Sequence, residues 1–96
     1  MTVTINKGAT PTSYQFFLSK GIKSYFLNNK IVIIEIPDCL MIREAKLSDT
    51  KTYSISKVHG AFTYTPKYHE DMLGIWSMEK QGDLFILNEK YKNELR

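Results

Sequence analysis

Residues 6–29, with the sequence NKGATPTSYQFFLSKGIKSYFLNN, carry the helical pattern on which the predicted fold depends. Their apolar residues recur at steps of three and four, a spacing that places them on one face of an α-helix. Thr10 and Pro11 suit the start of such a helix as N-cap and first helical residue, and Asn28 and Asn29 tolerate left-handed geometry at its end. We therefore predict a helix over residues 11–27 with an apolar face of Tyr14, Phe17, Leu18, Ile22, Tyr25 and Phe26.

On both sides of this segment the apolar period is two, as in β-strands. Residues 2–5 alternate and are rich in β-branched side chains, and residues 30–36, KIVIIEI, are apolar on both faces. A turn at Pro37 and Asp38 would pair residues 30–36 with a strand over 40–46, placing Ile36 opposite Cys39. A strand that is apolar on both faces must be covered on both sides.

The stretch SISKVHGAFTYT, residues 54–65, predicts a second hairpin, with strands over 51–58 and 61–65. His59 and Gly60 would form its two-residue turn, because both central positions of such turns need a positive φ. Four Ser and Thr side chains then face outward. The predicted inner face consists of Tyr53, Ile55, Phe62 and Tyr64.

A third hairpin is predicted for strands over 73–79 and 84–88, joined by a turn at Gln81 and Gly82. It would place Lys80 opposite Asp83 beside the turn. Trp76, Met78, Phe85 and Leu87 would share one face. Residues 88–96 are predicted to be a polar tail with at most one frayed helical turn.

Together these elements predict a single α+β domain over residues 1–96, with one N-terminal amphipathic helix on a curled, mostly antiparallel meander of about six strands. One helix of this length covers one side of a few strands but not both faces of the sheet. Either the sheet curls into a partial barrel or a second copy of the chain covers its outer face. We favour a homodimer.

Composition places the chain among soluble globular proteins, with 43% hydrophobic and 24% charged residues. The formal charge of +3 comes from scattered lysines and not from a basic run. The single cysteine, Cys39, excludes an internal disulfide and favours a reducing compartment. No signal peptide or membrane-length apolar run is visible, so we expect a cytosolic protein without membrane contact.

The sequence contains no motif that names a reaction, so we expect no enzyme, cofactor or metal. Nucleophilic catalysis would need Cys39 beside His59 or His69, but free cysteine is more often a buried packing residue. Residues 67–72, KYHEDM, hold possible metal ligands, yet adjacent side chains on a strand point to opposite faces. Glu35 and Glu44 lie at opposite ends of one hairpin face and are expected to solubilise the sheet.

The leading hypothesis is a small non-enzymatic binding module that acts through protein contact as a homodimer. Short chains rich in Lys, Asn, Ile and Tyr resemble phage and mobile-element proteins in composition, so we expect an inhibitor of a host factor. The surface expected to contact the partner is the outer side of the second hairpin and the segment after it: Lys57, His59, Thr63, Thr65, Lys67 and His69.

Two alternatives remain open. One is a nucleic-acid-binding module that stacks bases on sheet aromatics among scattered lysines. The other is a small-ligand binder with a pocket inside the curled sheet, lined by Tyr64, Trp76, Met78 and Phe85.

Overall fold

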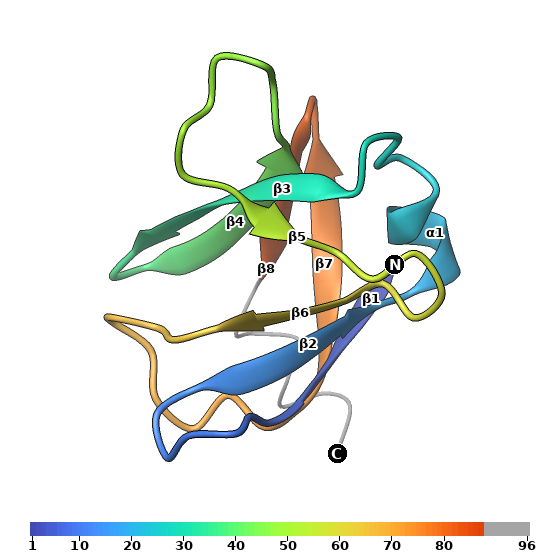
Figure 1. Cartoon of the computed structure of the whole chain (residues 1–96). Helices are drawn as coiled ribbons and strands as arrows, with labels where there is room; N and C mark the ends of the chain where they lie inside the picture. The colour runs from blue at the N-terminus through green and yellow to red at the C-terminus, as the bar shows by residue number, and fades with distance from the viewer. Residues whose placement is uncertain (88–96) are drawn as a thin grey trace.

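The computed structural model describes residues 1–87, which form eight strands and one short helix in an antiparallel near-barrel (Figure 1). The spatial order of the strands is β5-β3-β4-β8-β7-β1-β2-β6. The α+β class predicted from the sequence is therefore wrong. The elements are β1 (Thr2–Lys7), β2 (Tyr14–Leu18), α1 (Lys20–Lys23), β3 (Lys30–Ile36), β4 (Cys39–Glu44), β5 (Tyr53–Ser54), β6 (Ala61–Tyr64), β7 (Gly74–Gln81) and β8 (Leu84–Leu87).

The predicted helix over residues 11–27 is replaced by strand β2 and the four-residue helix α1. The run YQFFL also fits period two: Phe16 and Leu18 are buried, whereas Gln15 is exposed. Strand pairing prevails because β1 carries its own buried stripe, and Phe16 pairs with Ile5 in an antiparallel ladder. Tertiary pairing thus overrides a local helical period.

The residues predicted to start a helix form the loop between β1 and β2 instead. The Gly8 N–H donates to the Ser13 carbonyl at 2.9 Å, and Thr10 and Pro11 lie within that loop. Asn29 does adopt a positive φ of 57°, but it ends the connection that leads from α1 into β3. The predicted role of Thr10 and Pro11 as helix caps is therefore wrong.

The hairpin formed by β3 and β4 is confirmed in its register. Ile36 pairs with Cys39, Ile34 with Met41, and the intervening Pro37 and Asp38 form the turn. The prediction succeeded here because a short turn between two long apolar runs leaves few alternative pairings.

The predicted hairpin over residues 51–65 is wrong in its pairing. Strand β5 has only two residues and pairs with β3, whereas β6 pairs with β2, so that Tyr64 lies opposite Tyr14. A single backbone bond, from the Ser56 N–H to the Ala61 carbonyl, joins the two predicted partners at 2.9 Å in this connection. Within the described chain Gly60, and not His59, has the positive φ of this turn.

The third hairpin, β7 and β8, is offset from the prediction. Gln81 pairs with Leu84 and Met78 with Leu87, so the turn is Gly82 and Asp83, with Gly82 at φ 60°. The predicted Lys80 and Asp83 pair is not formed; Lys80 Nζ donates to the Gly82 carbonyl at 2.8 Å. The shared face is confirmed, because the register changed by an even number of residues. Its four members, Trp76, Met78, Phe85 and Leu87, are buried.

Closure of the sheet creates one core from the inward faces of all the long strands. In Figure 1, β3, β4 and β5 lie above β2 and β6, and β7 runs between the two groups. This curling covers the inner apolar faces within one chain. The expected homodimer, which would cover the outer face of the sheet, stays a prediction. The predicted polar tail, residues 88–96, lies outside the described residues.

No helix in the described chain has the length and apolar character needed to cross a membrane.

Candidate functional site: the seam between β3 and β6

The near-barrel is incomplete where its two end strands meet. β5 pairs with β3 only at Lys30 and Ile31, and the rest of β3 has no strand beside it on that edge within residues 1–87. Across the gap lies β6, the strand at the other end of the sheet (Figure 1). The eighth position in the wall is thus only half filled. We call this unfilled half the seam.

The seam is open because the chain before β5 leaves the wall. Arg43 on β4 binds Asp49 through two bonds of 2.9 Å, and Asp49 also accepts the Lys46 N–H at 2.7 Å. The Arg43 guanidinium, with the Lys46 N–H, lowers the pKa of Asp49 to about 2, so this carboxylate stays charged at neutral pH. These bonds hold residues 45–50 in a loop, and strand β5 begins only at Tyr53.

Backbone groups of β3 point into the seam. The Asn29 carbonyl accepts the Ile55 N–H at 2.8 Å on the β5 side, and the Lys30 carbonyl accepts the Ala45 N–H at 2.9 Å on the β4 side. Because the backbone groups of a strand alternate in direction, those of Ile33 and Glu35 face the seam. No backbone partner for either is found in the described chain.

Strand β6 faces the seam in the same way. The Gly60 carbonyl bonds to the Leu18 N–H on the β2 side, whereas the Ala61 carbonyl bonds to Ser56 on the β5 side. Alternation then directs the backbone groups of Thr63 into the seam, and there too the described residues supply no backbone partner. Hydrogen-bonding groups therefore point into the seam from both of its sides, β3 and β6.

Beneath the seam, the Glu35 carboxylate is held by four donors. Oε1 accepts the Tyr64 hydroxyl and the Lys67 N–H, both at 2.7 Å. Oε2 accepts the Tyr68 N–H at 2.9 Å and lies 2.8 Å from Nδ1 of His69. The Glu35 side chain is 2% exposed. This Glu35 clasp ties the segment after β6 to the end of β3.

These contacts set the protonation of the clasp. Burial alone would raise the pKa of Glu35, but the bonds from His69, Lys67, Tyr64 and Tyr68 outweigh it and lower the pKa to about 2. Burial and the bond to this anion raise the pKa of the Tyr64 phenol well above its usual value. Glu35 therefore remains a carboxylate with its lone pairs occupied, and it is a structural group that is poorly suited to act as a base.

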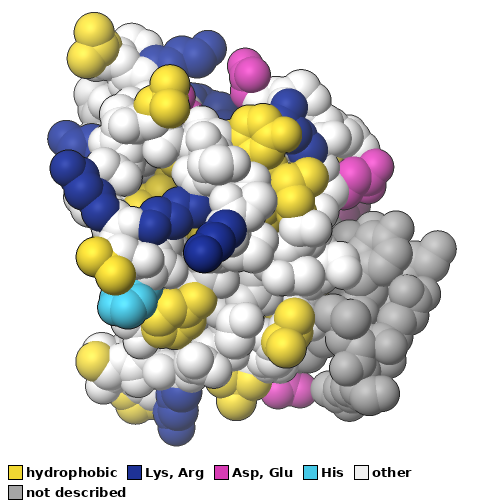
Figure 2. Space-filling view, turned by 90° about the vertical axis from the view of Figure 1, so that its right-hand side faces the viewer, with side chains coloured by type: hydrophobic (Ala, Val, Ile, Leu, Met, Phe, Trp, Pro, Cys, Tyr) yellow, Lys and Arg dark blue, Asp and Glu magenta, His cyan; other side chains and the backbone are white. Residues whose placement is uncertain are grey.

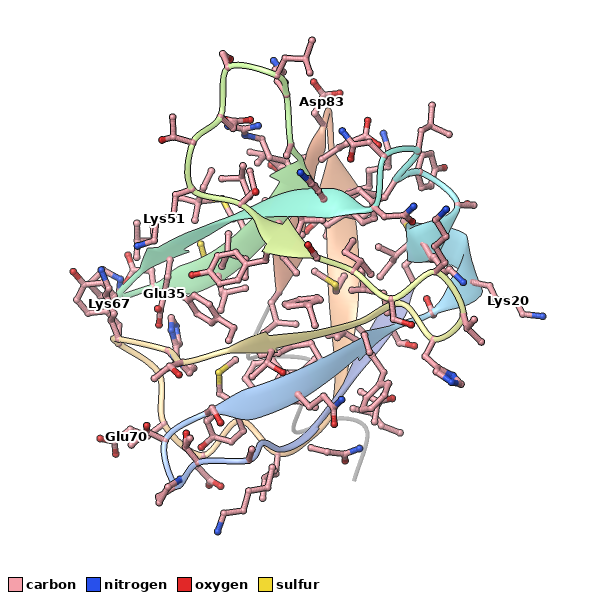
Figure 3. The ribbon with its side chains drawn as sticks, viewed as in Figure 1. Lys20, Glu35, Lys51, Lys67, Glu70 and Asp83 are labelled. Carbon is pink, nitrogen blue, oxygen red and sulfur yellow. The ribbon has the colours of Figure 1, made fainter. Side chains whose placement is uncertain are left out.

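The seam leads to a cleft of about 210 Å³, which we call the seam cleft. Tyr53 and Tyr64 meet there edge to face, with ring centres 5.5 Å apart. Two exposed lysines stand on opposite banks, Lys51 before β5 and Lys67 after β6 (Figure 3). The lining residues are Ile33, Glu35, Lys51, Tyr53, Tyr64, Thr65 and Lys67.

The structure divides the six residues predicted to contact a partner between two places. Thr65 and Lys67 line the seam cleft, Thr63 lies on the adjoining strand, and His69 is buried on Glu35. Lys57 and His59 lie elsewhere, exposed in the connection between β5 and β6.

That connection adjoins α1, since Lys23 Nζ donates to the Val58 carbonyl at 3.1 Å. Segments 19–30 and 55–60 carry no acidic residue. On this side of the molecule, lysine, histidine and apolar side chains lie side by side (Figure 2). The face formed by these two segments is basic.

A second cleft, of about 220 Å³, lies between the connection after α1, β4 and the β7–β8 turn. Lys80 Nζ stands 5.1 Å from the centre of the Tyr25 ring, and Tyr25 packs against Phe85. Its charged lining residues are of both signs: Arg43, Lys46 and Lys80 with Glu44 and Asp83. The pocket predicted around Trp76 and Met78 is packed core instead, since both side chains are buried.

The residues considered for catalysis or metal binding are not brought together. Cys39 is half-buried at the β3–β4 turn, and neither histidine is hydrogen-bonded to it within residues 1–87. His59 is exposed and His69 is buried. The described residues contain no cluster of metal-ligand type.

Glu35 is the residue whose role was predicted wrongly, because it was expected to solubilise the sheet surface. A signal was present: Glu35 shares its strand face with Ile31 and Ile33, and Ile31 is fully buried. An acidic residue on an inward face needs buried donors. Which donors these are could not be inferred from the sequence, because they come from residues about 30 positions away.

No family model, curated protein or solved structure matches the chain, so its function is inferred from the fold and the geometry of the site.

Proposed function

We propose that the protein is a non-enzymatic binding module that receives a short extended segment of a protein partner in the seam cleft. The observation that supports this most is the unfilled wall position, where backbone groups of Ile33, Glu35 and Thr63 face the cleft without a backbone partner in the described chain. Exposed strand edges of this kind bind partners by accepting a further strand.

The side chains of the cleft suit this role. The paired rings of Tyr53 and Tyr64 offer a rigid apolar floor for one side chain of the segment. The Glu35 clasp fixes the β6 side of the cleft, because it joins β3 to the end of β6 and the segment after it through four donors. A site that is formed before binding costs less free energy to occupy.

A nucleic-acid interface has less support. Phe16, Phe62 and Trp76 are buried, so they cannot stack on bases. Among the described aromatic residues, Tyr25 and Tyr68 are the ones more than half exposed, at 52% and 57%. If the protein were retained on heparin and bound no peptide, the nucleic-acid alternative would replace our proposal.

The test is binding of synthetic hexapeptides, prepared as a random library in two forms, with free and with amidated carboxyl ends. Thr63→Pro removes one N–H that faces the seam and leaves the ladder with β2 intact, because Phe62 and Tyr64 face that strand. Thr63→Val is the matched control, since it changes the side chain and keeps the N–H.

We expect peptides to be enriched on the wild-type protein, to lose at least about tenfold in affinity on Thr63→Pro and to keep their affinity on Thr63→Val. Enrichment of no peptide, or equal binding to the proline variant, would overturn the proposal. Circular dichroism of the variants checks that the sheet is retained.

A further inference from the structure

The seam cleft is closed at both of its ends. At one end β5 fills the wall, where Tyr53 pairs with Ile31. At the other end the Glu35 carboxylate bridges β3 to the Lys67 and Tyr68 amides. A glutamate side chain spans only a few ångströms, so no strand can pass through the wall at that level. A segment inserted beside β3 therefore cannot continue within the wall past Glu35, and we take this as the place where it ends.

The charge of the cleft favours an anionic group at the end of the inserted segment. Lys51 and Lys67 line the seam cleft from opposite sides, and neither forms an ion pair with a described residue. In Figure 3 both lie at the side of the molecule where Glu35 is found, and Lys20 lies on the opposite side. Glu35 is the acidic residue of the lining, and its oxygens are occupied by four internal donors. The hydrogen bonds leave the Glu35 charge in place, so the balance of two lysines and one carboxylate in the lining is positive.

The cleft also offers main-chain donors. The N–H groups of Glu35 and Thr63 point toward it from the two banks, because backbone directions alternate along β3 and β6. Backbone N–H groups are a common means of holding the C-terminal carboxylate of a peptide. The tyrosine pair beside them leaves an apolar place for the side chain of the last residue.

We propose that the seam cleft binds the C-terminal carboxylate of a peptide, with Lys51 and Lys67 pairing with its charge, the seam-facing N–H groups bonding to its oxygens, and Tyr53 and Tyr64 contacting the terminal side chain. This inference rests on the proposed function, because it names the part of the partner that enters the site.

The experiment compares each enriched hexapeptide as free acid and as amide, and adds an amidated form that ends in aspartate. Acetate alone is the probe for the isolated carboxylate. Binding is followed by titration of the full ¹⁵N-labelled chain at low salt, with the amides of Ile33, Glu35 and Thr63 as reporters. The variants are Lys51→Gln and Lys67→Gln. Lys20→Gln, remote from the cleft, is the matched control.

We expect the free acid to bind about tenfold more tightly than the amide, and each cleft lysine to contribute about threefold, as exposed charge pairs do. The preference should shrink with added salt, and Lys20→Gln should leave it unchanged. Acetate should shift the reporter amides only weakly.

Equal affinity of acid and amide at the reporter amides would overturn the carboxylate assignment and leave the binding module standing. Preference for the amidated aspartate form over the free acid would assign the cleft to an acidic side chain instead. Failure of every library peptide to move the reporter amides would overturn the proposed function itself. The three results are therefore distinguishable.

Discussion

The buried carboxylate of Glu35 holds the end of β6 and the segment after it against β3. Its carboxylate accepts bonds from three backbone or side-chain groups between Tyr64 and Tyr68 and from His69, all at the end of β6 or in the segment that follows it. Removing one member of a buried polar network is costly because the others lose their partner. The stability of the cleft therefore depends strongly on this single side chain.

Glu35→Gln should lower the free energy of unfolding by about 3 kcal/mol, because the neutral amide bonds more weakly and places its own NH₂ against these donors. Urea unfolding followed by fluorescence of the buried Trp76 measures this loss. Glu79→Gln, on an exposed position of β7, should change it by less than about 0.5 kcal/mol. A loss at Glu35 as small as that at Glu79 would contradict the role of the clasp.

Stability should also depend on acid pH through Glu35. The pKa of this carboxyl is lowered from 4.5, its ordinary value, to about 2 in the folded protein, so the folded form binds the proton less readily than the unfolded chain. The contribution is complete above pH 4.5 and is lost as pH falls from 4.5 toward 2, up to roughly 3 kcal/mol in all.

Asp49 adds to the same window, because Arg43 lowers its pKa to about 2 as well. Urea midpoints measured from about pH 6 to about pH 2.5 should therefore fall in both the wild type and Glu35→Gln, but less steeply in the variant. Parallel curves for the two proteins would show that the Glu35 pKa is not lowered by folding.

The apolar residues of β2 fit both the spacing of a helix and the spacing of a strand. The helical spacing puts Phe17 on the core face and leaves Phe16 outside it. The strand spacing buries Phe16 completely and leaves Phe17 half-buried. Phe16 is further fixed by stacking on Phe62 of β6, with ring centres 4.9 Å apart. Helix and strand therefore assign opposite environments to two neighbouring residues.

Phe16→Ala should accordingly cost about 4 kcal/mol, as large-to-small changes in a core do, and Phe17→Ala less than half of that. Urea unfolding of the two variants provides the comparison. A larger loss for Phe17 than for Phe16 would favour the helix over β2. The pair serves as its own control, because the same side chain is removed at adjacent positions.

In the barrel as a whole, the incomplete closure of the sheet should be visible without any partner. The amides of Ile33, Glu35 and Thr63 face the seam, whereas Val32, Ile34 and Phe62 are directed at neighbouring strands. Hydrogen exchange followed by NMR should show rapid exchange for the first group and protection for the second, because amides without a bonded partner exchange from the folded state. Equal protection would mean that the seam is closed in solution.

The parts of the structure that follow from short-range patterns were predictable. The register of β3 and β4 comes from a two-residue turn between apolar runs, and the inward faces of Phe62, Tyr64, Trp76 and Met78 come from alternation. Alternation survives errors of register of two residues, which is why the faces of β7 and β8 were right although their turn was displaced by one position.

Local sequence determined some features of this fold, and the pairing of strands far apart in the chain determined the others. Neighbouring residues alone encode the strand character of residues 30–44 and the sorting of side chains into inner and outer faces, so the amino-acid sequence was sufficient for both. Tertiary packing was needed to establish that residues 14–18 form a strand, that β6 pairs with β2 and that Glu35 is buried. Each of these outcomes is a competition between partners far apart in the chain, and its free energy includes burial that no local pattern contains.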